Sequence, residues 1–324
     1  MRAWQVQAAG SPGEALRLVE REPPTPGPGQ LRVRVTAAGI GLPDVFMCRG
    51  TYPLTPSLPF TPGQEATGTV TAVGEGVGTP VGSSVMGVTA FTDGHGSFAE
   101  ECLLLAGSAF TVPDGLTPAQ AAGFWIPNLT GWIGLVDRGQ IVAGDWLAVL
   151  GAGGGSGAAA VQLGRALGAH VIAVVGDEAR AALCRALGAD VVINHHDGPV
   201  AAALRDATGG HGVDLLYDPV GGAPAEEAAG ALARNGRLLA VGFASGAWPS
   251  IGVHRLVRAN ASLVGVYAGG YSREELDHIH AELSALVRDG HLASPVTEVP
   301  FADLPAALER MAARAVVGKL VLVP

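Results

Sequence analysis

The chain has 324 residues, of which 48% are hydrophobic and 15% are charged, and its formal net charge is −9 at pH 7. This length predicts about two domains, each with its own core. No run of about 18 apolar residues occurs, and the start lacks the apolar stretch of a signal peptide, so we expect neither a membrane-spanning helix nor export. The acidic balance, without a basic stripe, argues against nucleic acid as a partner.

The cysteines Cys48, Cys102 and Cys184 lie far apart in the sequence. Their number and spacing exclude a disulfide framework and a four-cysteine zinc site. We therefore expect the protein in a reducing compartment, the cytoplasm.

The N-terminal part of the chain predicts short strands separated by turns. Residues 31–35 alternate between apolar and polar with period two, as a half-buried strand does, and residues 67–73 repeat the pattern before a glycine cluster at 74–78. Dense proline and glycine at 23–29 exclude a helix there. These features indicate an antiparallel, barrel-like β domain.

Strands and helices alternate from Thr117 onward. Thr117 is a candidate N-cap, and Pro118 suits the first helical position. The later strands are continuous apolar runs, which is typical of a parallel sheet covered on both faces. The expected strands are 146–150, 171–175, 191–193, 215–217 and 238–241, and the expected helices are 157–167 and 178–187.

The C-terminal part predicts two helices, 273–289 and 304–313, and a final strand at 319–323. We expect these elements to return to the first domain. An edge strand is expected near 265–267, beside a glycine-rich loop. Because an unpaired edge is a liability, it favours pairing with a second copy of the chain.

A glycine-rich turn lies between the strand at 146–150 and an alanine-rich helix. In the spacing G-x-G-x-x-G, the three positions are Ala152, Gly154 and Gly157. Glycine allows a tight turn and a close approach of the backbone to a pyrophosphate, while the helix N-terminus supplies free N–H groups. A flexible loop is the alternative, but the flanking strand and helix favour a dinucleotide site.

Several motifs recur in order along almost the whole chain. They are 37–40 with 43–44, 49–52, 58–68, 151–168, 187–194, 217–222 and 318–322. On these motifs the chain resembles the zinc-independent quinone oxidoreductases of the medium-chain dehydrogenase/reductase superfamily. The resemblance implies an α/β fold: a GroES-like antiparallel β domain (1–122 and 268–324) and a Rossmann domain with a doubly wound parallel sheet (123–267). It also implies a homodimer.

The resemblance implies an enzyme without zinc. Where zinc-dependent relatives carry a cysteine and a histidine, this chain has Gly41 and Gln64. Glu65 alone cannot make a catalytic zinc site, which needs about three protein ligands. His278 and His280 lie two positions apart on an expected helix and so point to different faces. We therefore expect no metal.

Without a Lewis acid, the resemblance implies that hydrogen bonds polarise a carbonyl and that a nicotinamide supplies the hydride. Conjugated acceptors suit this chemistry, because hydride addition to a quinone or an enone leaves charge on oxygen. Tyr52 matches a family tyrosine at the substrate cleft and is the candidate donor; a packed loop tyrosine is the alternative. Asn128 and Thr130 match positions beside the nicotinamide. The implied pocket residues are Gly41, Phe46, Gln64 and Trp132, and the family's usual polar groups are missing at 41 and 46, which predicts an apolar pocket.

The choice of cofactor depends on the residues after the expected strand at 171–175. An acidic residue at such a strand end bonds the ribose 2′-OH of NAD. In NADPH-using relatives a small residue stands there, followed a few positions later by a basic residue, and Gly176 and Arg180 fit that pattern. Asp177 argues against it, because its carboxylate could compete with the phosphate. We expect NADPH rather than NADH. For Arg180 the alternative is an exposed helix residue without a role in cofactor binding. The cofactor-binding residues implied by the resemblance are Gly154, Gly155, Ser156, Gly157, Gly176, Arg180, His195, Gly242, Phe243, Tyr267 and Arg314.

Three functions follow from these features. The first is an NADPH-dependent reductase of quinones or α,β-unsaturated carbonyls. The second is an enoyl-thioester reductase, which would need a basic groove for a carrier phosphate. The third is a nucleotide-binding protein with little turnover, which the missing polar groups at Gly41 and Phe46 would suit.

Overall fold

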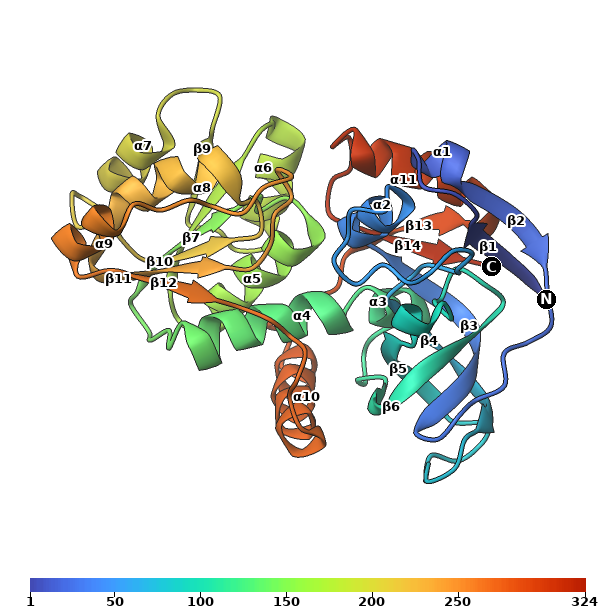
Figure 1. Ribbon diagram of the computed structural model, residues 1–324. Helices are drawn as coiled ribbons and strands as arrows, with labels where there is room; N and C mark the ends of the chain where they lie inside the picture. Colours follow the sequence, from blue (N-terminus) through green and yellow to red (C-terminus); the bar gives the residue numbers. More distant parts are fainter. The chain divides into compact units, whose positions relative to one another are not determined.

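The computed structural model describes residues 1–324, which form two compact units. Unit 1 comprises Met1–Ile126, Tyr271–Arg288 and Ser294–Pro324, and unit 2 comprises Pro127–Gly270 and Asp289–Ala293. Each unit contains one six-stranded sheet (Figure 1). The domain bounds predicted from the sequence stay a prediction.

The sheet of unit 1 is antiparallel except at one pairing and curls into a barrel-like shape. Its strand order is β13-β14-β3-β4-β5-β6, and β3 also pairs with β6, so β3 to β6 close on themselves. Only β13 and β14 run parallel, and β1 and β2 form a separate antiparallel pair. The strands are β1 (Arg2–Val6), β2 (Leu16–Glu20), β3 (Gln30–Ile40), β4 (Glu65–Val73), β5 (Ser84–Thr89), β6 (Glu101–Thr111), β13 (Val296–Pro300) and β14 (Lys319–Val323).

Five helices belong wholly to unit 1: α1 (Pro12–Ala15), α2 (Leu42–Cys48), α3 (Pro118–Ala122), α10 (Arg273–Arg288) and α11 (Leu304–Ala312). The predicted cap of α3 is confirmed, since the Thr117 hydroxyl accepts from the Gln120 N–H at 3.2 Å and the Gln120 side chain accepts from the Thr117 N–H at 2.9 Å. Leu304 and Leu308 of α11 belong to the barrel core. The last segments therefore return to the first sheet, as the sequence predicts.

The sheet of unit 2 is parallel throughout, in the order β12-β11-β10-β7-β8-β9. The chain moves outward in one direction from β7 to β9 and in the other from β10 to β12, so the order reverses between β7 and β10. The strands are β7 (Trp146–Leu150), β8 (His170–Val175), β9 (Val191–Asn194), β10 (Val213–Asp218), β11 (Leu232–Ala240) and β12 (Ser262–Gly265). The helices are α5 (Gly155–Ala166), α6 (Glu178–Ala186), α7 (Val200–Ala207), α8 (Gly222–Ala228) and α9 (Val253–Ala259).

Helices cover both faces of this parallel sheet. On one face, α5 packs so closely at Gly164 that a Cβ there would come within 3.1 Å of Val171 Cγ2. On the other, Ala148 and Ile172 form a core with residues of α7 and α8 (Figure 1). The doubly wound arrangement predicted from the continuous apolar strands is therefore confirmed.

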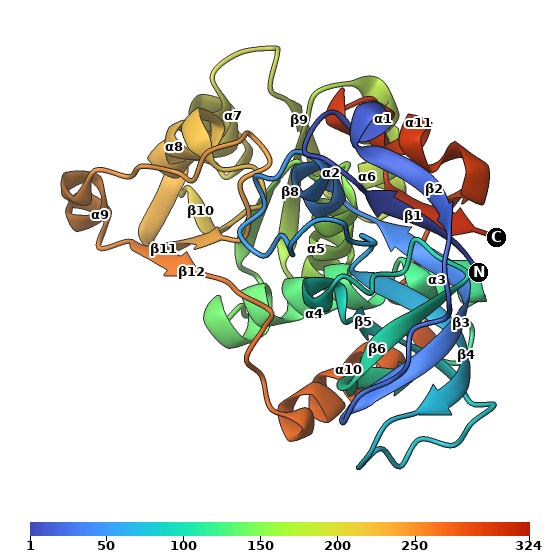
Figure 2. The ribbon, with the colours of Figure 1, turned by 45° about the vertical axis from the view of Figure 1, so that its right-hand side comes forward.

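Helix α4 (Trp125–Trp132) continues directly into a π-helical segment, Ile133–Arg138. Its first two residues belong to unit 1 and the rest to unit 2. Figure 2 labels α3 and α4, which are consecutive along the chain. No helix of the structure has both the length and the apolar character to cross a membrane.

Two features differ from the sequence prediction. The edge strand β12 ends at Gly265, so Val266 and Tyr267 lie outside it, and the Tyr267 side chain is exposed. The expected edge strand is therefore present, but it ends at Gly265, where its pairing with β11 ends, and does not extend to 267. Strand β13, which was not predicted, alternates buried and exposed residues only weakly.

Candidate active site

The predicted cofactor residues of unit 2 lie just beyond the ends of its parallel strands. They follow β7 (Gly154–Gly157, the first of these four being the N-cap of α5), β8 (Gly176), β9 (His195), β11 (Gly242 and Phe243) and β12 (Tyr267), with Arg180 in the first turn of α6. Ligands of doubly wound sheets bind at this carboxyl edge, beside the point where the strand order reverses. Arg314 is the exception, since it belongs to unit 1 and follows α11 with a φ of 58°.

The glycine-rich turn leaves no room for a side chain at Gly157. A Cβ on Gly157 would overlap the Gly151 carbonyl oxygen and lie 2.6 Å from Ala152 Cα. Gly154 is the N-cap residue of α5. Because glycine has no side chain, no N-cap side chain accepts a hydrogen bond from the first N–H groups of this twelve-residue helix. A tight turn that leads into an open helix N-terminus fits a pyrophosphate.

A buried tyrosine holds the Ser156 side chain. The Tyr217 hydroxyl on β10 lies 2.9 Å from Ser156 Oγ, and Tyr217 is fully buried. Burial raises the pKa of the Tyr217 hydroxyl well above its usual range. The serine hydroxyl is thus paired with the sheet, while the Gly154 N–H is used within the turn, donating to the Gly151 carbonyl at 3.0 Å. The sequence analysis missed this pair, although a tyrosine within an apolar strand is a signal for it.

The end of β8 carries no side chain at position 176. A Cβ on Gly176 would lie 2.8 Å from His195 Nε2, because the His195 ring covers this glycine. Burial and the neighbouring His196 hold the pKa of His195 below its usual value. Gly176 therefore offers no carboxylate to a ribose 2′-OH, and a side chain at this position would have to displace the end of the His195 side chain.

Asp177 and Arg180 form an ion pair in the first turn of α6. Asp177 is the N-cap residue, and its Oδ1 accepts from the Arg180 N–H at 2.9 Å. The Arg180 guanidinium donates to the other carboxylate oxygen. Arg180 is therefore held in place rather than extended into solvent as a free helix residue.

The predicted substrate residues of unit 1 lie on and around α2. Gly41 is the N-cap of this helix and donates its N–H to Asp44 Oδ2 at 2.8 Å, while Phe46 is half-buried on the helix. Tyr52 is also half-buried and packs against the barrel core. Gln64 directly precedes β4, and its amide Nε2 is buried without a hydrogen-bond partner.

The remaining predicted residues lie on α4 and belong to unit 2. Asn128 and Trp132 are buried, and Thr130 is half-buried. Trp125 at the start of the helix belongs to unit 1, where its ring centroid lies 4.5 Å from that of Phe110. Trp125 is thus a core residue.

A buried ion pair anchors the first turn of α4. Lys319 Nζ lies 2.6 Å from Glu65 Oε1, and Glu65 Oε2 accepts from the Ile126 N–H at 3.0 Å. The side chains of Lys319 and Glu65 are only 13% and 4% exposed. This contact has no local signal in the sequence, because its residues are far apart in the chain.

The residues around α2 do not fit a catalytic zinc ion. Gly41 has no ligand atom and Gln64 offers only an amide. The Asp44 carboxylate accepts from the N–H groups of Gly41 and Gly63, and Glu65 is engaged by Lys319. No group of three or more His, Cys, Asp or Glu side chains in the structure could hold a metal ion. Catalytic zinc needs about three protein ligands, and the residues around α2 do not provide them.

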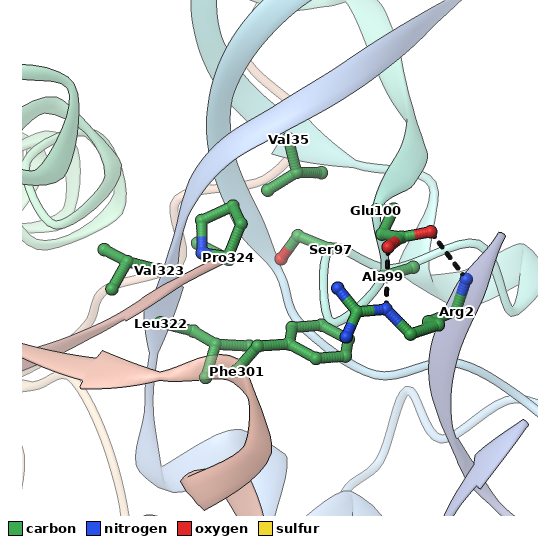
Figure 3. A pocket seen from close by; sticks show the side chains of 10 residues that line it. Arg2, Val35, Ser97, Ala99, Glu100, Phe301, Leu322, Val323 and Pro324 are labelled. Atoms are coloured by element: carbon green, nitrogen blue, oxygen red, sulfur yellow. Dashed lines mark hydrogen bonds and ion pairs between the residues drawn. The ribbon is translucent and has the colours of Figure 1, made fainter.

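A small hollow in unit 1 lies away from all of these residues. Figure 3 shows it beside Arg2, whose Nε donates to Glu100 Oε1 at 2.7 Å and whose guanidinium carbon lies 5.4 Å from the centre of the Phe301 ring. None of the predicted catalytic, cofactor or pocket residues lines it. It therefore has no part in the candidate site.

Comparison with known proteins defines the class. Residues 27–114 match the alcohol dehydrogenase GroES-like domain, and residues 155–285 match a family described as zinc-binding dehydrogenase. The chain is 31% identical over 303 residues to the quinone oxidoreductase-like protein 2 homolog of Nematostella vectensis, covering 91% of this chain and 82% of that protein. It is 33% identical over 303 residues to a mycocerosic acid synthase-like polyketide synthase of Mycobacterium tuberculosis, covering 92% of this chain and 14% of that protein.

A solved structure is similar over the full length of both chains. The structure of Escherichia coli quinone oxidoreductase complexed with NADPH has 30% sequence identity and a TM-score of 0.92, and the match covers 100% of each chain. The chain belongs to the medium-chain dehydrogenase/reductase superfamily, among its quinone oxidoreductase-like members. It is an oxidoreductase of this superfamily, and the predicted fold, a GroES-like antiparallel sheet with a six-stranded Rossmann-like parallel sheet, is confirmed.

Proposed function

We propose that the protein is a zinc-independent, NADPH-dependent reductase of quinones or α,β-unsaturated carbonyl compounds. The observation that carries the choice of cofactor is the end of β8, where Gly176 supplies no acidic side chain and Arg180 follows in the first turn of α6. Arg180 in the next turn supplies a cation that suits a 2′-phosphate. The similarity to a quinone oxidoreductase complexed with NADPH supports both the cofactor and the acceptor class.

Each predicted cofactor residue has a proposed role. The turn at Gly154–Gly157 binds the pyrophosphate through the N–H groups of Gly155, Ser156 and Gly157, and Arg180 and His195 bind the 2′-phosphate. Arg314 belongs to unit 1, and its role stays a prediction. Gly242, Phe243 and Tyr267 line the remaining length of the nucleotide, and Asn128 and Thr130 orient the nicotinamide. When bound, NADPH supplies the hydride.

The substrate side requires donors in place of a metal. We assign the Tyr52 hydroxyl to donate to the substrate oxygen on which charge develops. Gln64, whose amide N–H₂ lacks a partner in the structure, is available as a second donor. Gly41 and Phe46 make the substrate side of unit 1 apolar, which favours conjugated acceptors with little polarity besides the carbonyl. The pocket role of Trp132, which belongs to unit 2, stays a prediction.

An acceptor panel tests this function. Oxidation of NADPH and of NADH is followed with simple quinones, 2-alkenals, cyclic enones and enoyl thioesters. We expect turnover with a quinone or an enone and faster turnover with NADPH. If none of the acceptors is reduced, the proposal is contradicted and the protein is a nucleotide-binding protein with little turnover.

A second candidate, enoyl-thioester reduction, draws support from one observation. The chain is similar over 92% of its length to a segment of a polyketide synthase-like protein. Turnover confined to the enoyl thioesters of the panel would favour this function over the first.

We further propose a cytoplasmic homodimer that pairs through the edge of the parallel sheet. β12 pairs only with β11, and Leu263 on this strand is exposed. Val253 and Val257 on the neighbouring α9 are 71% and 69% exposed, and no residue of that helix is buried. An exposed apolar edge favours association. Sedimentation that finds only a 32.6 kDa species at micromolar concentration would contradict the dimer.

A further inference from the structure

The first turn of α6 commits one carboxylate entirely to one arginine. Asp177 Oδ1 accepts from the Arg180 N–H at 2.9 Å, and the Arg180 guanidinium donates to Oδ2. The Asp177 side chain is 42% exposed and that of Arg180 only 21%. The arginine is therefore the more fixed partner, while the carboxylate faces water.

The stem of Arg180 is fixed by the glycine-rich turn. A Cβ on Gly153 would lie 2.6 Å from both Cβ and Cγ of Arg180 and 2.9 Å from its Cδ. The side chain thus lies directly over the turn that we assign to the pyrophosphate. Gly153 holds the stem and Asp177 holds the head, so the guanidinium is kept at the nucleotide edge of the sheet.

The effect of a bound nucleotide on the Asp177–Arg180 pair depends on whether its ribose carries a 2′-OH or a 2′-phosphate. A ribose 2′-OH is uncharged and leaves the pair intact. A 2′-phosphate competes for the guanidinium and brings two negative charges close to Asp177, which is unfavourable. The position one residue earlier cannot compensate, because Gly176 has no side chain.

We propose that Asp177 is a specificity-determining residue: its carboxylate competes with the 2′-phosphate for the Arg180 guanidinium and so limits the preference for NADPH over NADH. This inference rests on the proposed NADPH site. It makes the chain a moderate rather than a strict discriminator between the two cofactors. The same carboxylate keeps the arginine ordered before the nucleotide binds.

Asp177→Asn tests the inference with little structural change. Asparagine is as good an N-cap as aspartate, so the hydrogen bond from the Arg180 N–H is retained while the charge is lost. We expect NADPH and 2′,5′-ADP to bind at least roughly fivefold more tightly, which corresponds to about 1 kcal/mol. Binding of NADH and 5′-AMP should stay within about twofold. Asp177→Ser, a shorter cap that cannot reach the guanidinium, should shift the affinities in the same direction.

Glu178→Gln is the matched control. It removes the same charge from the same helix turn, but Glu178 pairs with Arg185 at 2.6 Å and not with Arg180. All affinities are measured by calorimetry at one ionic strength. The inference is overturned if Asp177→Asn changes the NADPH:NADH affinity ratio by less than twofold, or if Glu178→Gln raises it equally. Wild-type protein that binds neither cofactor would overturn the proposed function as well, whereas an unchanged ratio with intact NADPH binding refutes the inference alone.

Discussion

The ion pair between Lys319 and Glu65 gives the sharpest stability prediction. Lys319 is the only lysine of the chain, and both side chains are almost fully buried. Removing one partner of a buried pair leaves an uncompensated charge and costs about 3–5 kcal/mol. Because Glu65 keeps the Ile126 N–H as a partner at 3.0 Å, we expect Lys319→Met to lower the free energy of unfolding by about 3 kcal/mol, near the lower end of that range.

A double-mutant cycle measures this pair in urea titrations followed by tryptophan fluorescence and circular dichroism. Adding Glu65→Gln to Lys319→Met removes the orphaned charge and should restore roughly 2 kcal/mol. Asp277→Asn is the control, since it breaks an exposed pair with Arg273 and should cost only about 0.3–0.5 kcal/mol. A loss below about 1 kcal/mol in Lys319→Met, or a double variant no more stable than it, would refute the reasoning.

Four further outcomes are expected. Gly157→Val should abolish NADPH binding with the fold intact, because its side chain would press on the backbone of the turn; an unchanged Kd in a fluorescence titration would contradict the site. Tyr52→Phe should lower turnover on an accepted enone by about 10²–10³ with NADPH binding unchanged, and a fall below threefold would remove Tyr52 from the catalytic residues. Burial raises the pKa of Asp44 from 3.8 to about 7, so the folded state holds this proton more tightly than the unfolded state. The contribution of Asp44 to stability should therefore fall as pH rises from about 4 to about 7, at most by about 1.4 kcal/mol per unit, and the difference in unfolding free energy between wild type and Asp44→Asn should change with pH accordingly. Chelators should leave the activity unchanged, and a loss restored by zinc would contradict the zinc-independent mechanism.

The sequence predicts the architecture of unit 2 well because its strands are buried on both faces. Continuous apolar runs at 146–150 and 171–175 cannot belong to a half-exposed sheet, and the glycine turn between strand and helix marks the nucleotide edge. The elements that escape prediction have weaker local signals. Strand β13 is mostly exposed, and the end of β12 depends on pairing with β11 rather than on residue type.

The side-chain partnerships of the candidate site are less accessible from the sequence. Lys319 and Glu65 are 254 residues apart, so only the folded barrel brings them together. The pair Asp177–Arg180 did have a local signal, since i, i+3 spacing from an N-cap allows contact on a helix. The sequence shows an acid and a base with opposite implications for the cofactor, while the structure shows that they neutralise each other.

The most direct test of the proposed reaction follows the hydride itself. The protein is incubated with a cyclic enone and NADPH carrying deuterium at the transferable C4 position, and the product is analysed by NMR. The proposal predicts deuterium at the β-carbon of the saturated ketone, with the α-proton taken from solvent. Unreacted enone, or product without deuterium at the β-carbon, would contradict hydride transfer to a conjugated acceptor.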